Sequence, residues 1–127
     1  MRKVVLRNLS IANAANFEAH YCDSFSSRLR GLTFHAPLLP YEGILLVQNR
    51  ESRLDTSIHM LGVFFDLAVF WINANYEVVD LKLARSWRLA YFPAAPAQYI
   101  LEIDARYLDA FKIGDRVGIF DEHEMSG

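Results

Sequence analysis

Short segments of this chain alternate apolar and polar residues, which is the pattern of β-strands that bury one face. In the clearest of them, residues 98–103, the side chains of Tyr99, Leu101 and Ile103 share one face. Residues 44–47 form a continuous apolar run of the kind found in fully buried strands. We predict strands at residues 3–8, 17–22, 42–48, 67–72, 77–83, 98–103 and 116–120.

Two short helices and a hairpin turn are predicted between these strands. Asp23 or Ser24 can cap the first turn of a helix that ends near Gly31. Asp104 can cap a second helix of about two turns. Residues 73–76 contain two asparagines, which tolerate positive φ, and are therefore predicted to form a hairpin turn.

The order of these elements predicts the fold class. Many short strands with two helices, and no regular alternation of strand and helix, are typical of antiparallel β proteins. We expect a mostly β (α+β) fold, a compact antiparallel β-sandwich or barrel with two short peripheral helices. The 127 residues are enough for one domain with its own core. We assign residues 1–120 to that domain and 121–127 to a flexible tail.

Composition narrows the class of protein. The content of 53% hydrophobic and 22% charged residues is that of a folded globular domain. The net charge of −2 provides no general attraction to nucleic acid or to a membrane surface, so we expect neither as a partner. Cys22 is the single cysteine, which excludes an intramolecular disulfide and a cysteine-based zinc cluster. Because no signal peptide or membrane-spanning segment is apparent, we expect a cytoplasmic location.

A histidine and an aspartate stand out in the most apolar part of the sequence. His59 leads into the apolar run 63–72, and Asp66 interrupts that run. Ionisable groups amid apolar residues must be paired, neutralised or exposed to water, so this segment is the best place to look for a site. The two residues are an odd number of positions apart, which places them on opposite faces of an unbroken strand. A bulge at Gly62 would let them converge.

Five motifs follow one another in order along the chain. They are Phe25-x-x-Arg28-Leu29-Arg30-Gly31-Leu32, Glu42-Gly43-Ile44-Leu45-Leu46, Ser57-Ile58-His59, Tyr99-Ile100-Leu101-Glu102-Ile103 and Lys112-Ile113-Gly114-Asp115-Arg116-Val117. With this series the chain resembles the small prokaryotic family catalogued as domain of unknown function 192, over nearly its whole length. The resemblance implies a mostly β fold, a small sandwich or barrel with peripheral helices, in a family whose members are often exported and have no settled activity.

The chain departs from the family pattern at its carboxylate. The resemblance implies Ser-Ile-His-Thr, then Met, then Pro-Ile-Asp, and Ala68 occupies the position of that aspartate. Asp66 lies two residues earlier, on the same face of a strand and displaced by roughly 7 Å. Either Asp66 preserves the charge of the site or the site has been lost, and the sequence leaves both open.

Two classes of function fit these residues. The first is a non-catalytic binding or accessory module that holds a small anionic ligand, a glycan or a protein segment near His59, Asp66 and Trp87. The alternative is a small hydrolase or lyase that uses His59 with Asp66 or Glu102 as an acid/base pair. We favour the binding module. The candidate binding residues are Arg28, Arg30, Ser57, His59, Asp66, Trp87, Arg88 and Glu102.

The arginines have two interpretations. Arg28 and Arg30, with Arg85 and Arg88 beside Trp87, can form an anion or carbohydrate pocket with an aromatic floor. Equally, these side chains can pair with acidic residues and tie loops to the sheet, which is the usual role of surface arginines.

We expect no metal and no cofactor. The potential ligands, such as His35, His59 and Glu102, are scattered along the chain without ligand spacing. A monomer is the default expectation, and exposed aromatic residues leave a homodimer open.

Overall fold

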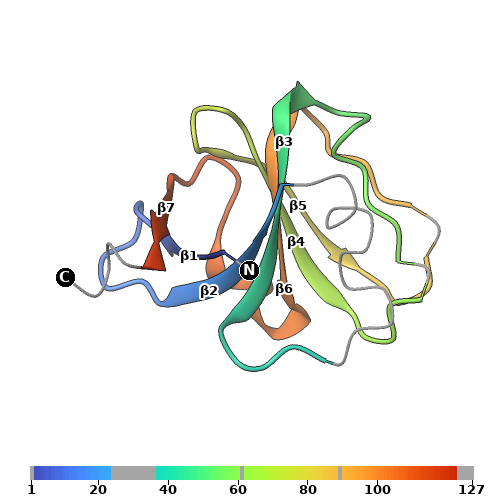
Figure 1. The fold of residues 1–127 in the computed structure, drawn as a ribbon, viewed down its shortest axis with the longest axis horizontal. Helices are drawn as coiled ribbons and strands as arrows, with labels where there is room; N and C mark the ends of the chain where they lie inside the picture. The colour runs from blue at the N-terminus through green and yellow to red at the C-terminus, as the bar shows by residue number, and fades with distance from the viewer. Residues whose placement is uncertain (1, 24–36, 61, 89, 123–127) are drawn as a thin grey trace.

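The structure is a computed structural model that describes residues 2–23, 37–60, 62–88 and 90–122 (Figure 1). Seven strands account for most of the regular structure, and one short 3₁₀ helix, η1, precedes the last strand. The elements are β1 (Lys3–Asn8), β2 (Asn16–Cys22), β3 (Glu42–Ser52), β4 (Leu67–Ile72), β5 (Val78–Ala84), β6 (Ala97–Asp104), η1 (Ala105–Ala110) and β7 (Val117–Asp121).

The seven strands form one mixed sheet in the order β5-β4-β6-β3-β2-β1-β7. The predicted mostly β class is confirmed, and the sheet is not closed into a barrel. The sheet departs from a purely antiparallel one at a single pair, because β2 and β3 run parallel. Residues 23–41 connect these two strands, and a parallel pair needs such a long connection of about a dozen residues or more.

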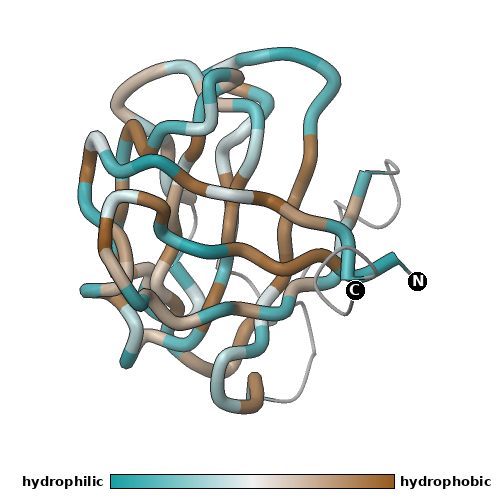
Figure 2. The backbone as a smooth tube through the Cα atoms, turned by 90° about the vertical axis from the view of Figure 1, so that its left-hand side faces the viewer, coloured by the Kyte–Doolittle hydropathy of each residue, from teal (hydrophilic) through white to brown (hydrophobic). Residues whose placement is uncertain are grey.

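The sheet buries side chains on both faces, so the molecule has two cores. Strand β4 lies inside the sheet, and all six of its residues are buried. Its neighbour β6 alternates between the cores, with Leu101 in one and Ile100 in the other. We call the core with Leu101 and Phe111 the first core, and the one with Ile100 and Trp71 the second core. Hydrophobic residues lie mainly along the strands, and hydrophilic ones mainly along the connections (Figure 2).

The hairpin turn predicted at residues 73–76 and the cap predicted at Asp104 both form, but the residue with positive φ and the type of helix differ from the prediction. Asn73 accepts hydrogen bonds from the backbone of Asn75 and Glu77 through its side chain, at 3.0 Å each. The positive φ of this turn belongs to Tyr76 rather than to an asparagine. Asp104 caps the chain that follows it, as predicted, and accepts from the Arg106 amide at 2.9 Å, but the result is a 3₁₀ helix. The helix predicted to begin at residue 23 or 24, and the end of the tail, lie outside the described residues.

Candidate functional site

Two loops meet beside the sheet and carry four of the eight predicted binding residues, Ser57, His59, Trp87 and Arg88. Residues 57–60 and 87–91 are joined by backbone hydrogen bonds. Ile58 and Tyr91 exchange two bonds, of 2.9 and 2.8 Å. The Met60 amide donates to the Arg88 carbonyl at 3.0 Å, and the Trp87 amide donates to the Met60 carbonyl at 2.9 Å. The segment of His59 is therefore held against that of Trp87 and Arg88. We call the outer surface of these two loops, with residues 64–66 and 85–86, the loop surface.

His59 points to solvent from this pair of segments. Its neighbours Ile58 and Met60 are buried in the second core, and the imidazole between them is exposed. Ser57, two residues earlier, is half-buried. Within the described part of the chain, no hydrogen bond or ion pair joins His59 to Asp66. The structure thus brings His59 to the loop surface without an orienting acid.

A turn at Gly62 separates His59 from strand β4. Gly62 has a φ of 77°, a value that favours glycine, and the Val63 amide donates to the Met60 carbonyl at 3.1 Å across this turn. Strand β4 begins only at Leu67, so Asp66 precedes the strand instead of sharing a strand face with Ala68. Ala68 itself is fully buried in the first core.

Asp66 anchors the turn that carries Trp87. One carboxylate oxygen accepts the Ser86 amide at 2.8 Å, and the other lies 3.6 Å from the Arg85 guanidinium. Both partners belong to the loop after β5, so the carboxylate connects the start of β4 to that loop. Its side chain keeps 38% of its surface exposed, so the ion pair is a screened surface interaction and the amide bond is the stronger restraint.

Trp87 and Phe64 form an exposed aromatic pair on the loop surface. Their ring centroids are 5.3 Å apart with an interplanar angle of 72°, an edge-to-face contact. Trp87 is 51% exposed and Phe64 61% exposed. Trp87 also has a φ of 63°, which is rare for a bulky side chain. Phe64 was not singled out in the sequence, where it reads as one of several residues in an apolar run.

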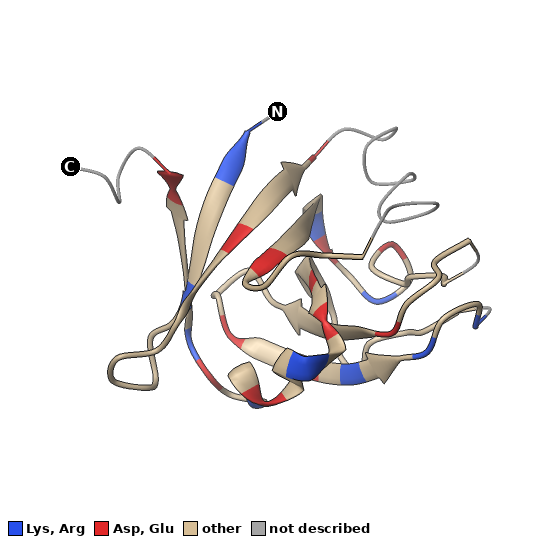
Figure 3. Ribbon diagram, turned by 90° about the horizontal axis from the view of Figure 1, so that it is seen from below, with Lys and Arg blue, Asp and Glu red and all other residues tan. Residues whose placement is uncertain are grey.

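Two arginines lie close to Trp87 in the sequence, on either side of it. Arg85 and Arg88 are exposed on the same loop. Over the rest of the ribbon, acidic and basic residues are interspersed (Figure 3). Arg28, Arg30 and His35 lie outside the described residues.

Glu102 lies apart from the loop surface, within the sheet. It is 5% exposed, on the face of β6 that contributes Ile100 to the second core, and its neighbours across the sheet are Ile44 and Val69. Burial raises the pKa of this carboxyl to about 7. The structure therefore does not bring Glu102 to the exposed imidazole of His59.

His20 lies in the same cross-strand row as Glu102. His20 pairs with Ile44, which in turn pairs with Glu102, so the two ionisable residues stand about 10 Å apart along the row. The Nδ1 atom of His20 is buried without a hydrogen-bond partner. Sequence reasoning missed this residue, although the alternation of residues 17–22 gives it the same face as Cys22, which is buried in the second core.

The other predicted features have simpler local roles. Asp104 pairs with Arg106 at 3.2 Å, and Glu42 accepts the Leu39 amide at 3.0 Å. In the described ranges no group of three or more His, Cys, Asp or Glu side chains is arranged to hold a metal ion. None of the helical structure described here has the length and apolar character needed to cross a membrane.

Comparisons with known proteins agree on one family. Residues 8–119 match the model of the family DUF192, described as "Uncharacterized ACR, COG1430". The UPF0127 protein PF1050 of Pyrococcus furiosus is 32% identical over 112 residues, which cover 87% of this chain and 93% of that protein. A UPF0127 protein of Thermococcus sibiricus is 37% identical over 106 residues, covering 82% of this chain and 67% of its own length.

Two solved structures share the fold. A proposed transcription regulator of Sinorhizobium meliloti aligns with a TM-score of 0.79 and 16% identity, over 93% of this chain and 92% of its own. A protein of unknown function from Novosphingobium aromaticivorans aligns with a TM-score of 0.73 and 18% identity, over 91% of this chain and 83% of its own. At these identities the likeness extends to the fold alone.

Proposed function

This chain belongs to the uncharacterised family DUF192, and we propose that it is a non-catalytic binding module whose loop surface recognises an acidic protein segment. The exposed pair of Trp87 and Phe64 is the observation that carries this proposal. Tryptophan, other aromatic residues and arginine dominate the energetics of protein interfaces, and here they gather on two loops that the sheet holds in place.

The conformation of Trp87 supports a role in binding. A left-handed backbone costs a residue with a side chain about 1–2 kcal/mol. At Trp87 this conformation leaves about half of the residue's surface exposed to water, so burial of the ring offsets little of the cost. The Met60 carbonyl accepts the Trp87 amide and the Asp66 carboxylate accepts the Ser86 amide, and these two bonds hold the strained conformation in place. Strained backbone that the surrounding structure maintains is typical of functional positions.

The charges favour an acidic partner. Arg85 and Arg88 flank Trp87 in the sequence and are both exposed, and Asp66 pairs only with Arg85. A partner with an apolar side chain and neighbouring carboxylates would cover the rings and pair with the guanidinium groups.

The non-catalytic assignment rests on the partners of Asp66. A general acid/base pair needs the carboxylate and the imidazole within hydrogen-bond reach, or one water apart. Asp66 is engaged by Ser86 and Arg85, and Glu102 is buried in the sheet. Among the described residues, neither carboxylate of the hydrolase or lyase alternative is hydrogen-bonded to His59.

A displayed library of random peptides, selected on the immobilised protein, tests the proposal. We expect enriched peptides that combine an aromatic or aliphatic residue with two or more acidic ones. Synthetic copies should bind at least tenfold more weakly to Trp87→Ala and to Phe64→Ala. Tyr76→Ala is the matched control, since Tyr76 is also an exposed aromatic residue but stacks on Tyr99 at a distant hairpin.

Two further measurements, the affinity of a His59 variant and the integrity of the bound peptide, distinguish binding from catalysis. His59→Gln should lower the affinity moderately, and mass spectrometry should recover the peptide unchanged after prolonged incubation. A peptide that is cleaved by the wild-type protein and spared by His59→Gln would establish the enzyme alternative instead. Enriched peptides that bind Trp87→Ala as tightly as the wild type would refute the loop surface as the site.

A further inference from the structure

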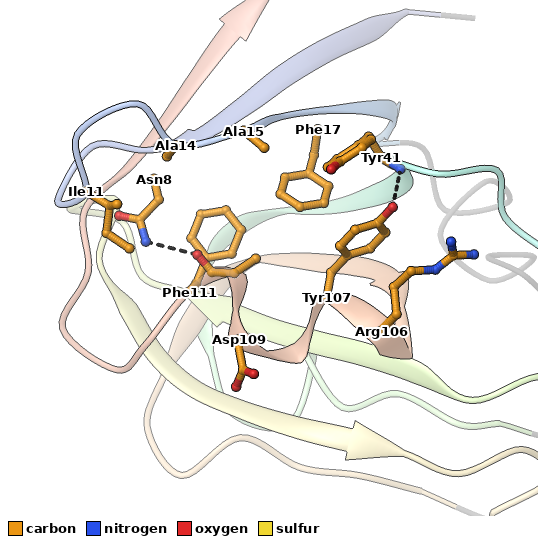
Figure 4. Close-up of a pocket in the computed structure, with 11 residues that line it drawn as sticks. Asn8, Ile11, Ala14, Ala15, Phe17, Tyr41, Arg106, Tyr107, Asp109 and Phe111 are labelled. Carbon is orange, nitrogen blue, oxygen red and sulfur yellow. Dashed lines mark hydrogen bonds between the residues drawn. The ribbon is translucent and has the colours of Figure 1, made fainter.

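A cavity lies on the first-core side of the sheet, between η1 and the loop that joins β1 to β2 (Figure 4). The cavity has a volume of about 320 Å³ and opens to solvent. Aromatic rings form its floor, and the small residues Ala14 and Ala15 form the opposite wall. None of these residues belongs to the loop surface, so this is a separate site.

The floor is a cluster of four aromatic rings. Phe17 contacts Tyr107 edge to face at 5.2 Å between centroids, and it lies 6.0 Å from Phe111. Tyr41 packs on Tyr107 at 5.0 Å. Phe17 and Phe111 are buried in the first core, so the floor is rigid and continuous with the packed interior. A flat apolar ligand would gain contact area mainly against Tyr41 and Tyr107, whose rings are partly exposed, while Phe17 and Phe111 support them from the core.

Both sides of the cavity contain left-handed backbone. Tyr41 has a φ of 60°, which is strained for a bulky residue, and Asn13 in the β1–β2 loop has the same φ, which asparagine tolerates. The Tyr41 amide donates to the Tyr107 hydroxyl at 3.2 Å, and its carbonyl accepts the Glu18 amide at 2.9 Å. These bonds keep the Tyr41 ring at the edge of the floor, where it is about half exposed.

The polar groups inside the cavity are already satisfied. The Asn8 side chain donates to the Ala110 carbonyl at 3.0 Å and to Asp115 at 2.7 Å, and it accepts the Ser10 amide at 2.9 Å. The interior therefore offers a ligand mainly apolar contact. The part of the ligand that enters must be apolar, since a polar group would lose its hydration without a new partner.

A cation stands at the mouth of the cavity. Arg106 lies with its guanidinium carbon 5.4 Å from the centre of the Tyr107 ring, and only its Nε atom is bonded to Asp104, at 3.2 Å. Among the described residues neither terminal nitrogen has a hydrogen-bond partner, so both can donate to another carboxylate in a bidentate arrangement. Two carboxylates lie near this cation: Asp104 is paired with it, and Asp109 is exposed and points away from the aromatic floor (Figure 4).

From this arrangement we infer a binding site for a small aromatic monocarboxylate. Its ring lies between the Ala14–Ala15 wall and the floor, and its carboxylate pairs with Arg106. The volume is about twice the roughly 150 Å³ of a cavity that accepts benzene, so a fused two-ring compound fits the space. The inference does not depend on the proposed function of the loop surface.

Calorimetric titration with 2-naphthoate, followed by amide NMR, tests the inference on the full chain. We expect one saturable site with a Kd below ~1 mM, and shifts confined to the residues around Phe17 and Tyr107. The neutral analogue 2-naphthamide should bind at least fivefold more weakly. Arg106→Gln should remove that preference, whereas Arg50→Gln, at an exposed arginine elsewhere, should keep it.

A second pair of variants tests the cavity itself. Ala14→Leu and Ala15→Leu each place a larger side chain against the floor, and both should abolish binding while thermal unfolding stays cooperative. Either variant suffices if the other fails to fold. Three results would overturn the inference: no saturation up to ~10 mM, equal affinity for the acid and the amide, or unaltered binding by a folded leucine variant.

Discussion

Trp71 in β4 donates its indole N–H to the carbonyl of Thr56 at 2.6 Å, and both residues are fully buried. The Thr56 hydroxyl in turn donates to the Ser52 carbonyl. The side chain of a central strand thereby holds the beginning of the loop that carries His59. The loop surface is thus anchored to the second core through this bond as well as through the packing of Ile58 and Met60.

Replacing Trp71 by phenylalanine should loosen this loop. The change leaves the Thr56 carbonyl buried without its donor and opens space in the second core, and together these should lower the free energy of unfolding by about 2–4 kcal/mol. Urea denaturation measures the loss. Hydrogen exchange should show lower protection at Ile58 in this variant, and unaltered protection there in Phe70→Leu, a first-core control on the same strand. Equal loss of protection in both would mean that the indole bond has no special role.

The strain at Trp87 predicts an unusual ranking of two variants. Trp87→Ala and Trp87→Gly both remove the ring and its contact with Phe64. Only glycine relieves the left-handed backbone, so the glycine variant should be the more stable of the two by about 1 kcal/mol. Chemical denaturation of the pair measures this difference directly. A more stable alanine variant would show that the turn relaxes out of the left-handed region once the ring is gone.

Asp66 should stabilise the loop mainly through the Ser86 amide. Asp66→Asn keeps an oxygen that can accept this bond, and it loses only the exposed contact with Arg85, so the expected loss is within about 0.5 kcal/mol. Asp66→Ala removes both and should cost about 1–2 kcal/mol. Thermal unfolding of the two variants decides the matter. A loss as large for asparagine as for alanine would assign the main role to the charge.

Most of the strands could be predicted because their signal is local. The alternation at residues 98–103 and the apolar run at 67–72 depend only on neighbouring side chains, and both segments are strands in the structure. The cap at Asp104 and the turn at Asn73 also formed, since both rest on a side chain that bonds to the nearby backbone.

The arrangement of the site could not be predicted, because it depends on contacts between distant segments. The parallel pairing of β2 with β3 places His20 in a row with Glu102, and no local pattern encodes that register. Likewise, the partner of Asp66 is a backbone amide twenty residues later, at Ser86. A backbone amide is present at almost every residue, so the sequence does not reveal which one Asp66 binds, and it left open a pairing of Asp66 with His59.

Gly43 is expected to be intolerant of any side chain. A Cβ atom at this position in β3 would lie 2.6 Å from a methyl of Ile103 and 2.8 Å from the Glu102 carbonyl, and a backbone atom of a central strand cannot move away. Gly43→Ala should cost about 3 kcal/mol or prevent folding. Gly114→Ala is the control, because its Cβ meets open space and the cost of about 1–2 kcal/mol comes only from a φ of 94°. Equal losses in the two variants would contradict the close approach of β3 and β6.

Glu102 should make the stability of this protein fall as the pH rises. Burial holds its pKa at about 7 in the folded state, against 4.5 when exposed, so between these values the folded chain binds more protons than the unfolded one. Below pH 4.5 the carboxyl is protonated in both states and has no effect on the pH dependence. Across this window the wild type should lose about 3 kcal/mol through this group, and above pH 7 the penalty should be constant.

Glu102→Gln isolates this effect. The buried amide has a cost of its own, but that cost does not depend on pH, so the difference in unfolding free energy between variant and wild type is the quantity to follow. It should shift by about 3 kcal/mol in favour of the variant between pH 4.5 and pH 8, as measured by urea denaturation at a series of pH values. Glu51→Gln, at an exposed carboxyl, controls for the loss of one negative charge. A difference that stays constant with pH would mean that the folded protein binds no extra proton at Glu102. The carboxyl would then be ionised inside the sheet and would need a compensating cation close to it.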